Sequence, residues 1–78
     1  MSIGDMDKRV RTQRDARCAD YQRQAEALER AGQWRRAERL WLAAYDSTVD
    51  TVLREAFCRR RDACVRQLNA LRQRRWPA

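Results

Sequence analysis

Apolar residues recur every three or four positions through most of this 78-residue chain, and only two glycines and one proline interrupt the pattern. No stretch alternates with the period of two that is typical of a half-buried strand. Gly32 is the one strong helix breaker between Asp5 and Trp76. The pattern therefore predicts an all-α fold of three helices, at about 7–31, about 33–45 and about 47–74.

The first two predicted helices carry apolar faces that suit each other. The face of the first contains Cys18, Tyr21, Ala25 and Leu28, and that of the second contains Trp34, Ala37, Leu40, Trp41 and Ala44. Gly32 between them is expected to adopt the left-handed conformation that ends a helix. Alanines opposite indoles let two antiparallel helices approach closely, and the spacing is similar to that of a tetratricopeptide-like helical hairpin, of which the chain has one unit.

The start of the long C-terminal helix has two interpretations. Ser47 and Asp50 resemble a capping box with aspartate in place of glutamate. Alternatively, Asp50 is itself the N-cap. The apolar stripe of this helix, interrupted by Arg60, is Val49, Leu53, Phe57, Cys64, Leu68 and Leu71.

The helix lengths predict an exposed apolar surface. The second helix is about 18 Å long, whereas each outer helix exceeds about 35 Å, so the second cannot cover both of the others. We expect Leu68, Leu71 and Trp76 to project beyond the core without an intrachain partner, which marks an oligomer or partner interface. Leu42 and Tyr45 lie off the main face of the second helix and either cover the third helix or belong to the same interface.

A chain of this size forms one domain, with a core that supplies only about 3–5 kcal/mol. Residues 16–76 are expected to form the helical domain, while residues 1–15 are mostly polar and are expected to fray. Oligomerisation or a partner chain is the expected source of further stability. The beginning of the chain lacks the features of a secretory signal, and its three cysteines fit a reducing cytoplasm.

The sequence predicts no metal, no cofactor and no enzymatic activity. It has no histidine and no CxxC pair, so it lacks the usual spacing of zinc ligands. A general base would have to be a carboxylate, a lysine or a thiolate. Cys58, beside three arginines, is either a reactive thiol or a buried to half-buried small side chain, and we prefer the second interpretation.

The net charge of +7 is the excess of eighteen basic residues, all but one of them arginine, over eleven acidic ones. Two groups of arginines on the third helix are candidates for contacts with phosphates or with an acidic partner: Arg59, Arg60 and Arg61, and Arg72, Arg74 and Arg75. The alternative is a solvated face, with Arg60 reaching back to Glu29 or Glu38. The turn after Gly32 does not fit a helix-turn-helix, so nucleic-acid binding is not the preferred interpretation.

Residues 21–61 resemble the AraC negative regulators, a family of small bacterial regulators. The matching residues are Tyr21, Ala25, Leu28-Glu29-Arg30, Gly32, Trp34, Ala37, Leu40-Trp41, Ala44, Arg54, Phe57-Cys58 and Arg59-Arg60. The Trp34-Arg35-Arg36-Ala37 string and the Arg60-Arg61-x-x-Cys64 ending are also similar to the PerC-like transcriptional activators. An asparagine and a tryptophan expected between Ala44 and Arg54 are absent.

The resemblance implies a cytoplasmic, non-enzymatic transcriptional regulator that forms homo-oligomers. It implies binding to a regulatory protein, either an AraC-type activator or a nucleoid-associated silencer. Two alternatives remain open: a PerC-like DNA-binding activator, and an inhibitor of a host protein encoded on a mobile element.

Overall fold

The computed structural model describes the backbone of residues 3–75 and the side chains of residues 16–74. It contains three α-helices, α1 (Ile3–Arg30), α2 (Trp34–Ser47) and α3 (Thr51–Arg75), and no strand within the described residues. The predicted all-α, three-helix fold is confirmed, although α1 begins before Asp7. Trp76 lies outside the described residues, as do the side chains of residues 1–15 and of Arg75.

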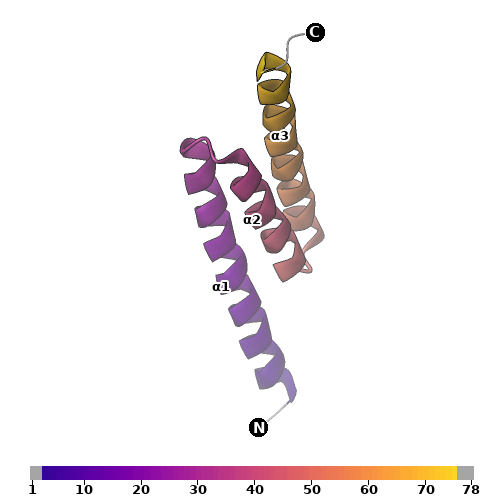
Figure 1. Cartoon of the computed structure of the whole chain (residues 1–78). Coiled ribbons are helices and arrows are strands. Elements are labelled where there is room, and N and C mark those ends of the chain that lie inside the picture. Colours follow the sequence, from indigo (N-terminus) through magenta and orange to yellow (C-terminus); the bar gives the residue numbers. More distant parts are fainter. Residues whose placement is uncertain (1–2, 76–78) are drawn as a thin grey trace.

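The short helix α2 lies between the two long helices (Figure 1). α1 and α2 form an antiparallel hairpin, α3 returns along the other side of α2, and the free ends of α1 and α3 run past α2 in opposite directions. The fold measures 64 × 21 × 12 Å, with a radius of gyration of 16.0 Å. A compact chain of this length has a radius of about 11.5 Å. The molecule is therefore an elongated layer about one helix thick, and this shape leaves much of each helix uncovered.

α1 ends in a Schellman motif at Gly32, as the sequence predicts. The φ angle of Gly32 is +73°. The amide of Gln33 donates to the carbonyl of Leu28 at 2.8 Å, and that of Gly32 donates to the carbonyl of Glu29 at 3.0 Å. Glycine suits this left-handed position because it has no Cβ.

The turn between α2 and α3 decides how α3 begins. Asp50 Oδ1 accepts hydrogen bonds from the backbone amides of Val52 at 2.9 Å and Leu53 at 3.2 Å, which makes Asp50 the N-cap. Ser47 Oγ donates instead to the carbonyl of Ala44 at 2.8 Å, within α2. The capping-box interpretation is wrong because α2 continues through Ser47.

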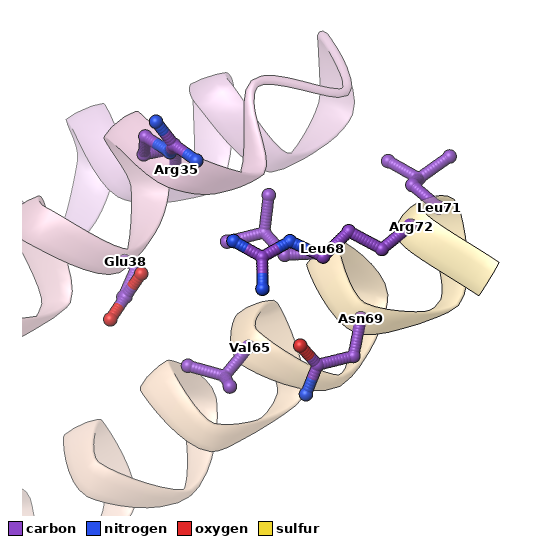
Figure 2. Close-up of a pocket in the computed structure, with 7 residues that line it drawn as sticks. All are labelled: Arg35, Glu38, Val65, Leu68, Asn69, Leu71 and Arg72. Atoms are coloured by element: carbon purple, nitrogen blue, oxygen red, sulfur yellow. The ribbon is translucent and has the colours of Figure 1, made fainter. Parts of the chain in front are cut away.

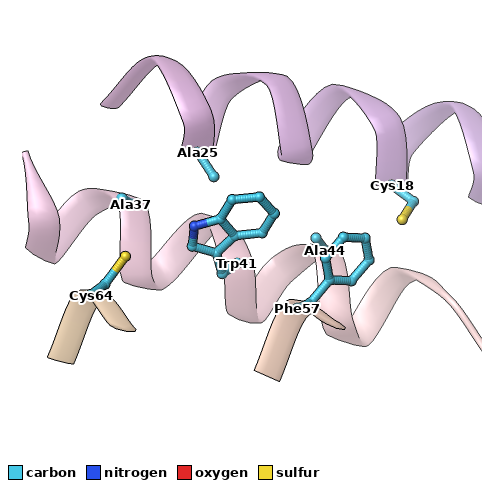
Figure 3. Close-up of a cluster of buried hydrophobic side chains, with 7 residues drawn as sticks. All are labelled: Cys18, Ala25, Ala37, Trp41, Ala44, Phe57 and Cys64. Carbon is cyan, nitrogen blue, oxygen red and sulfur yellow. The ribbon is translucent and has the colours of Figure 1, made fainter. Parts of the chain in front are cut away.

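The core follows α2, where both long helices pack against it (Figure 3). Its buried apolar members are Cys18, Ala25, Ala37, Trp41, Ala44, Phe57 and Cys64. The half-buried residues packed against them are Tyr21, Leu28, Trp34, Leu40 and Tyr45. The rings of Trp41 and Phe57 stack with their centroids 5.7 Å apart, and they are the only large side chains in the buried set. The apolar faces predicted for the first two helices are confirmed.

The stripe predicted for the third helix is correct at Phe57 and Cys64 but wrong at its beginning. Val49 is 72% exposed because it precedes the Asp50 cap and lies in the turn. Leu53 is 38% exposed, since it lies in the first turn of α3, one helical turn before the core begins at Phe57.

Candidate functional site

A polar cluster on one face of the layer joins all three helices. The carboxylate of Glu29 in α1 accepts hydrogen bonds from Trp41 Nε1 in α2 at 3.0 Å, from the guanidinium of Arg60 in α3, and from Cys64 Sγ in α3 at 3.5 Å. The Arg60 guanidinium also lies over the Trp41 ring, 4.5 Å from its centroid, in a cation–π contact. The Glu29 side chain is only 16% exposed. The cluster therefore fixes both outer helices relative to α2.

The charges in this cluster stabilise one another. Burial would raise the pKa of Glu29, but the hydrogen bonds from Arg60 and Trp41 outweigh it and hold that pKa below its ordinary value. The hydrogen bond to Glu29 raises the pKa of Arg60. Burial, together with the hydrogen bond to Glu29, raises the pKa of Cys64 to about 11. At neutral pH the pair is charged and the Cys64 thiol is protonated, which suits a structural joint.

The two arginines that flank Arg60 also pair with carboxylates of this chain. Arg59 lies 2.7 Å from Glu55, one turn earlier in α3, in an exposed pair. Arg61 Nε lies 3.6 Å from Glu38 Oε1 and so links α3 to α2. Three of the predicted phosphate contacts are therefore engaged within the chain, while Arg72 and Arg74 are exposed near the end of α3.

A groove runs between α2 and α3, and two core residues, Trp41 and Phe57, form part of its wall. Its residues recur at spacings of three and four, so they share one side of each helix. On α2 they are Arg35, Glu38, Trp41, Leu42 and Tyr45; on α3 they are Phe57, Cys58, Arg61, Val65, Leu68, Asn69, Leu71 and Arg72. We call this surface the α2–α3 groove.

The α2–α3 groove consists of two depressions separated by the Arg61–Glu38 pair. One, of about 250 Å³, lies where α2 ends and α3 begins, between Leu42, Tyr45 and Cys58. The other, of about 460 Å³, lies where α2 begins and α3 ends (Figure 2). Both depressions combine apolar side chains with at least one arginine.

The structure places the four described members of the predicted interface in this groove. Leu42 is 43% exposed and Leu71 is 48% exposed, whereas Tyr45 and Leu68 are half-buried. Tyr45 is covered in part by Arg54, whose guanidinium carbon lies 4.1 Å from the ring centroid.

Leu68 and Leu71 were expected to project beyond the core, and neither is among the core residues or those packed against them, although Leu68 is half-buried. They line a further shallow depression of about 340 Å³ with the turn between α1 and α2 and with the first turns of α2. The elongated layer lets α3 pass this turn before it projects, so the two leucines are partly covered.

Sequence reasoning missed the contribution of Arg35 and Val65 to the groove. The missed signal was the spacing that places Arg35 and Glu38 on the same side of α2 as Leu42 and Tyr45.

Cys58 is exposed, so the preferred interpretation of a buried or half-buried side chain is wrong. It lines the smaller depression beside Tyr45 and Arg61. Cys18 and Cys64 are buried, and all three cysteines are free thiols.

Comparison of the chain with protein-family models, curated proteins and solved structures finds no match. Within the described residues, no group of three or more acidic, histidine or cysteine side chains is arranged to hold a metal ion. A search of the same residues finds no helix with the length and apolar character needed to cross a membrane.

Proposed function

We propose that this protein is a small, non-enzymatic transcriptional regulator that acts by binding another regulatory protein through the α2–α3 groove. The observation that carries the binding mode is the pair of exposed leucines, Leu42 and Leu71, which line two depressions between the same two helices. Exposed apolar side chains that gather in one concave surface are typical of protein interfaces. The regulatory role is supported by the resemblance of residues 21–61 to the AraC negative regulators.

The energetics favour a partner that covers this surface. A leucine that is about half exposed gains roughly 1 kcal/mol when its remaining surface is removed from water. The buried set has only two large side chains, Trp41 and Phe57, so a few such gains are substantial beside the stability of the chain. An AraC-type activator or a nucleoid-associated silencer is the class of partner we propose.

Some residues of the resembling motifs stabilise the fold, whereas others, such as Cys58 and Arg35, line the groove. Glu29, Trp41 and Arg60, which belong to the resembling motifs, build the polar cluster that joins the helices. Leu42 and Leu71 lie outside those motifs and line the groove. In this proposal the polar cluster holds the helices in place, and the groove defines which protein is bound.

The alternative of a PerC-like DNA-binding activator is supported by the net charge and by Arg72 and Arg74, which are exposed. It is weakened at Arg59, Arg60 and Arg61, because each pairs with a carboxylate of this chain. Binding through phosphates weakens steeply as salt is added. An inhibitor from a mobile element would use the same groove as a regulator and would differ in the protein that it binds.

Cytoplasmic location and self-association through the C-terminal half of α3 belong to the same proposal. Leu68 and Leu71 also line the depression beside the turn between α1 and α2, and self-association would use that side of α3 rather than the α2–α3 groove. The likeness of the α1–α2 hairpin to a tetratricopeptide unit stays a prediction. Removing residues 67–78 deletes Leu68 and Leu71, and this truncation is expected to abolish both oligomerisation and partner binding.

Size-exclusion chromatography with light scattering tests the proposal, with and without a short DNA duplex, at low and moderate salt. The immobilised chain is then used to capture proteins, with the truncation after Arg66 as a control. We expect an oligomer that leaves the duplex unshifted, and a regulatory protein captured by the full chain alone. A salt-sensitive complex with the duplex and no captured protein would contradict the proposal.

A further inference from the structure

The rim of the α2–α3 groove is basic while its floor is apolar. Arg35 lies on the α2 side and Arg72 on the α3 side, and both are exposed. In Figure 2, Arg72 extends across the groove toward α2, and Val65 and Leu68 point toward α2 from the floor. Glu38 is the one carboxylate of the larger depression, and Arg61 already pairs with it. The groove thus offers positive charge around an apolar strip.

We infer that the occupant of this groove is an acidic amphipathic helix of the partner protein, an inference that rests on the proposed function. Two packed helices leave a groove between them, and the side chains of a further helix can pack into it. From Arg35 to Tyr45 the α2–α3 groove is about 15 Å long, which corresponds to about three helical turns. A helix of that length places apolar residues on the leucines of the floor and carboxylates beside the arginines of the rim.

A second copy of this chain fits the groove poorly because its projecting segments are themselves basic. Residues 66–75 contain four arginines and no acidic residue. Residues 3–17 contain five basic and three acidic residues. Like charges facing each other across an interface disfavour association, whereas carboxylates favour it.

Nucleic acid also matches the surface less well than an acidic helix does. Its phosphates would satisfy Arg35 and Arg72, but it has no apolar stripe to cover Leu42, Leu68 and Leu71. Proteins that bind single strands place aromatic side chains under the bases. The larger depression is lined by Val65 and leucines, and in the smaller one the Trp41 and Phe57 rings are buried while Arg54 lies over the Tyr45 ring.

The experiment titrates the full chain with a synthetic acidic peptide of about four helical turns, with leucines at spacings of three and four and glutamates elsewhere. A peptide of the same composition with scrambled leucine positions is the first control, and a short DNA duplex is the second. Fluorescence anisotropy at moderate salt measures each affinity. We expect the amphipathic peptide to bind at least about tenfold more tightly than the scrambled one.

Two matched pairs of variants locate the site. Arg35→Glu with Arg72→Glu reverses two charges at the rim, and Arg17→Glu with Arg23→Glu makes the same change on the exposed side of α1. Leu71→Asn removes an apolar contact, and Val52→Asn makes a similar change at an exposed position outside the groove. We expect the rim and Leu71 variants to weaken binding at least about tenfold and their controls by less than about threefold. Circular dichroism checks that each variant is folded.

Equal weakening by the rim variant and the α1 variant would show attraction by net charge alone and would overturn the inference. Failure of the peptide to bind at millimolar concentration would also overturn it, as would displacement of the peptide by the duplex. If the rim variant still captures the partner protein, the inference of an acidic helix fails while the proposed function stands. If the wild-type chain captures no protein and binds only the duplex, the proposed function fails as well.

Discussion

Glu29 of α1 forms an ion pair with Arg60 of α3 across the indole of Trp41, which belongs to the helix between them. One carboxylate thus links the two outer helices of the layer and also accepts a hydrogen bond from the middle helix. In a thin fold with few large buried side chains, such a link determines how the long helices are placed along α2.

Glu29→Gln is expected to destabilise the fold by about 1–2 kcal/mol, because a charged group with several hydrogen bonds loses its charge. This value allows for solvent screening, since Arg60 is 45% exposed. Urea unfolding followed by circular dichroism measures the change. Glu55→Gln is the matched control: it also removes a carboxylate paired with an arginine, but in an exposed pair, and should cost less than about 0.5 kcal/mol. Equal losses for the two variants would show that the Glu29 cluster is not a joint between helices.

Acid is expected to weaken the contribution of Glu29. The pKa of Glu29 is lowered in the folded chain from its ordinary value of 4.5, so the folded state binds fewer protons at this group than the unfolded state does. Its stabilising effect is complete above the unfolded pKa and is lost as the pH falls through the folded pKa. The difference in unfolding free energy between wild type and Glu29→Gln should stay constant from pH 7 to about 5.5 and shrink below 4.5. If the difference in unfolding free energy between wild type and Glu29→Gln grew on acidification, the prediction would be wrong.

The three cysteines are expected to react with a thiol reagent at very different rates. Cys58 is exposed, whereas Cys18 and Cys64 are buried. The rise in the pKa of Cys64 from 9.0 to about 11 lowers its thiolate fraction about 100-fold at pH 8. A chromogenic disulfide reagent should therefore label one thiol rapidly, and Cys58→Ser should remove that fast phase. Two or more thiols reacting at the fast rate would contradict the burial of Cys18 or Cys64.

Asp50→Ala is expected to destabilise the chain by about 1 kcal/mol, because it removes the side chain that accepts hydrogen bonds from two amides at the start of α3. Ser47→Ala should have a smaller effect, since Ser47 Oγ bonds a carbonyl within α2. Thermal unfolding of both variants measures the difference. If Ser47→Ala proves the more harmful, then Ser47 rather than Asp50 caps the helix in solution.

Local features of the fold were predictable because they depend on neighbouring residues. Gly32 ends α1 since it is the residue that adopts a positive φ angle without strain. The buried faces of α1 and α2 follow from spacings of three and four, and Trp41 is buried on the predicted face of α2.

Features that depend on how the helices are placed were harder to predict. Leu53 continues the stripe of Phe57 but lies too near the beginning of α3 to be covered. Arg60 was expected to reach either Glu29 or Glu38, and only the arrangement of α1 and α3 around α2 decides between them. The spacing that puts Arg35 and Leu42 on one side of α2 can be read from the sequence. That this side borders a groove follows only from the position of α3 beside α2.

The central claim is that the α2–α3 groove is the surface that binds the partner protein. The most direct test incorporates a photo-crosslinking amino acid at Leu42 or Leu71 in the groove, and at Arg17 or Arg23 on α1 as controls. We predict that both groove positions crosslink to the same protein, and that the α1 positions do not. Crosslinks to a partner from Arg17 or Arg23, with none from Leu42 or Leu71, would contradict the account.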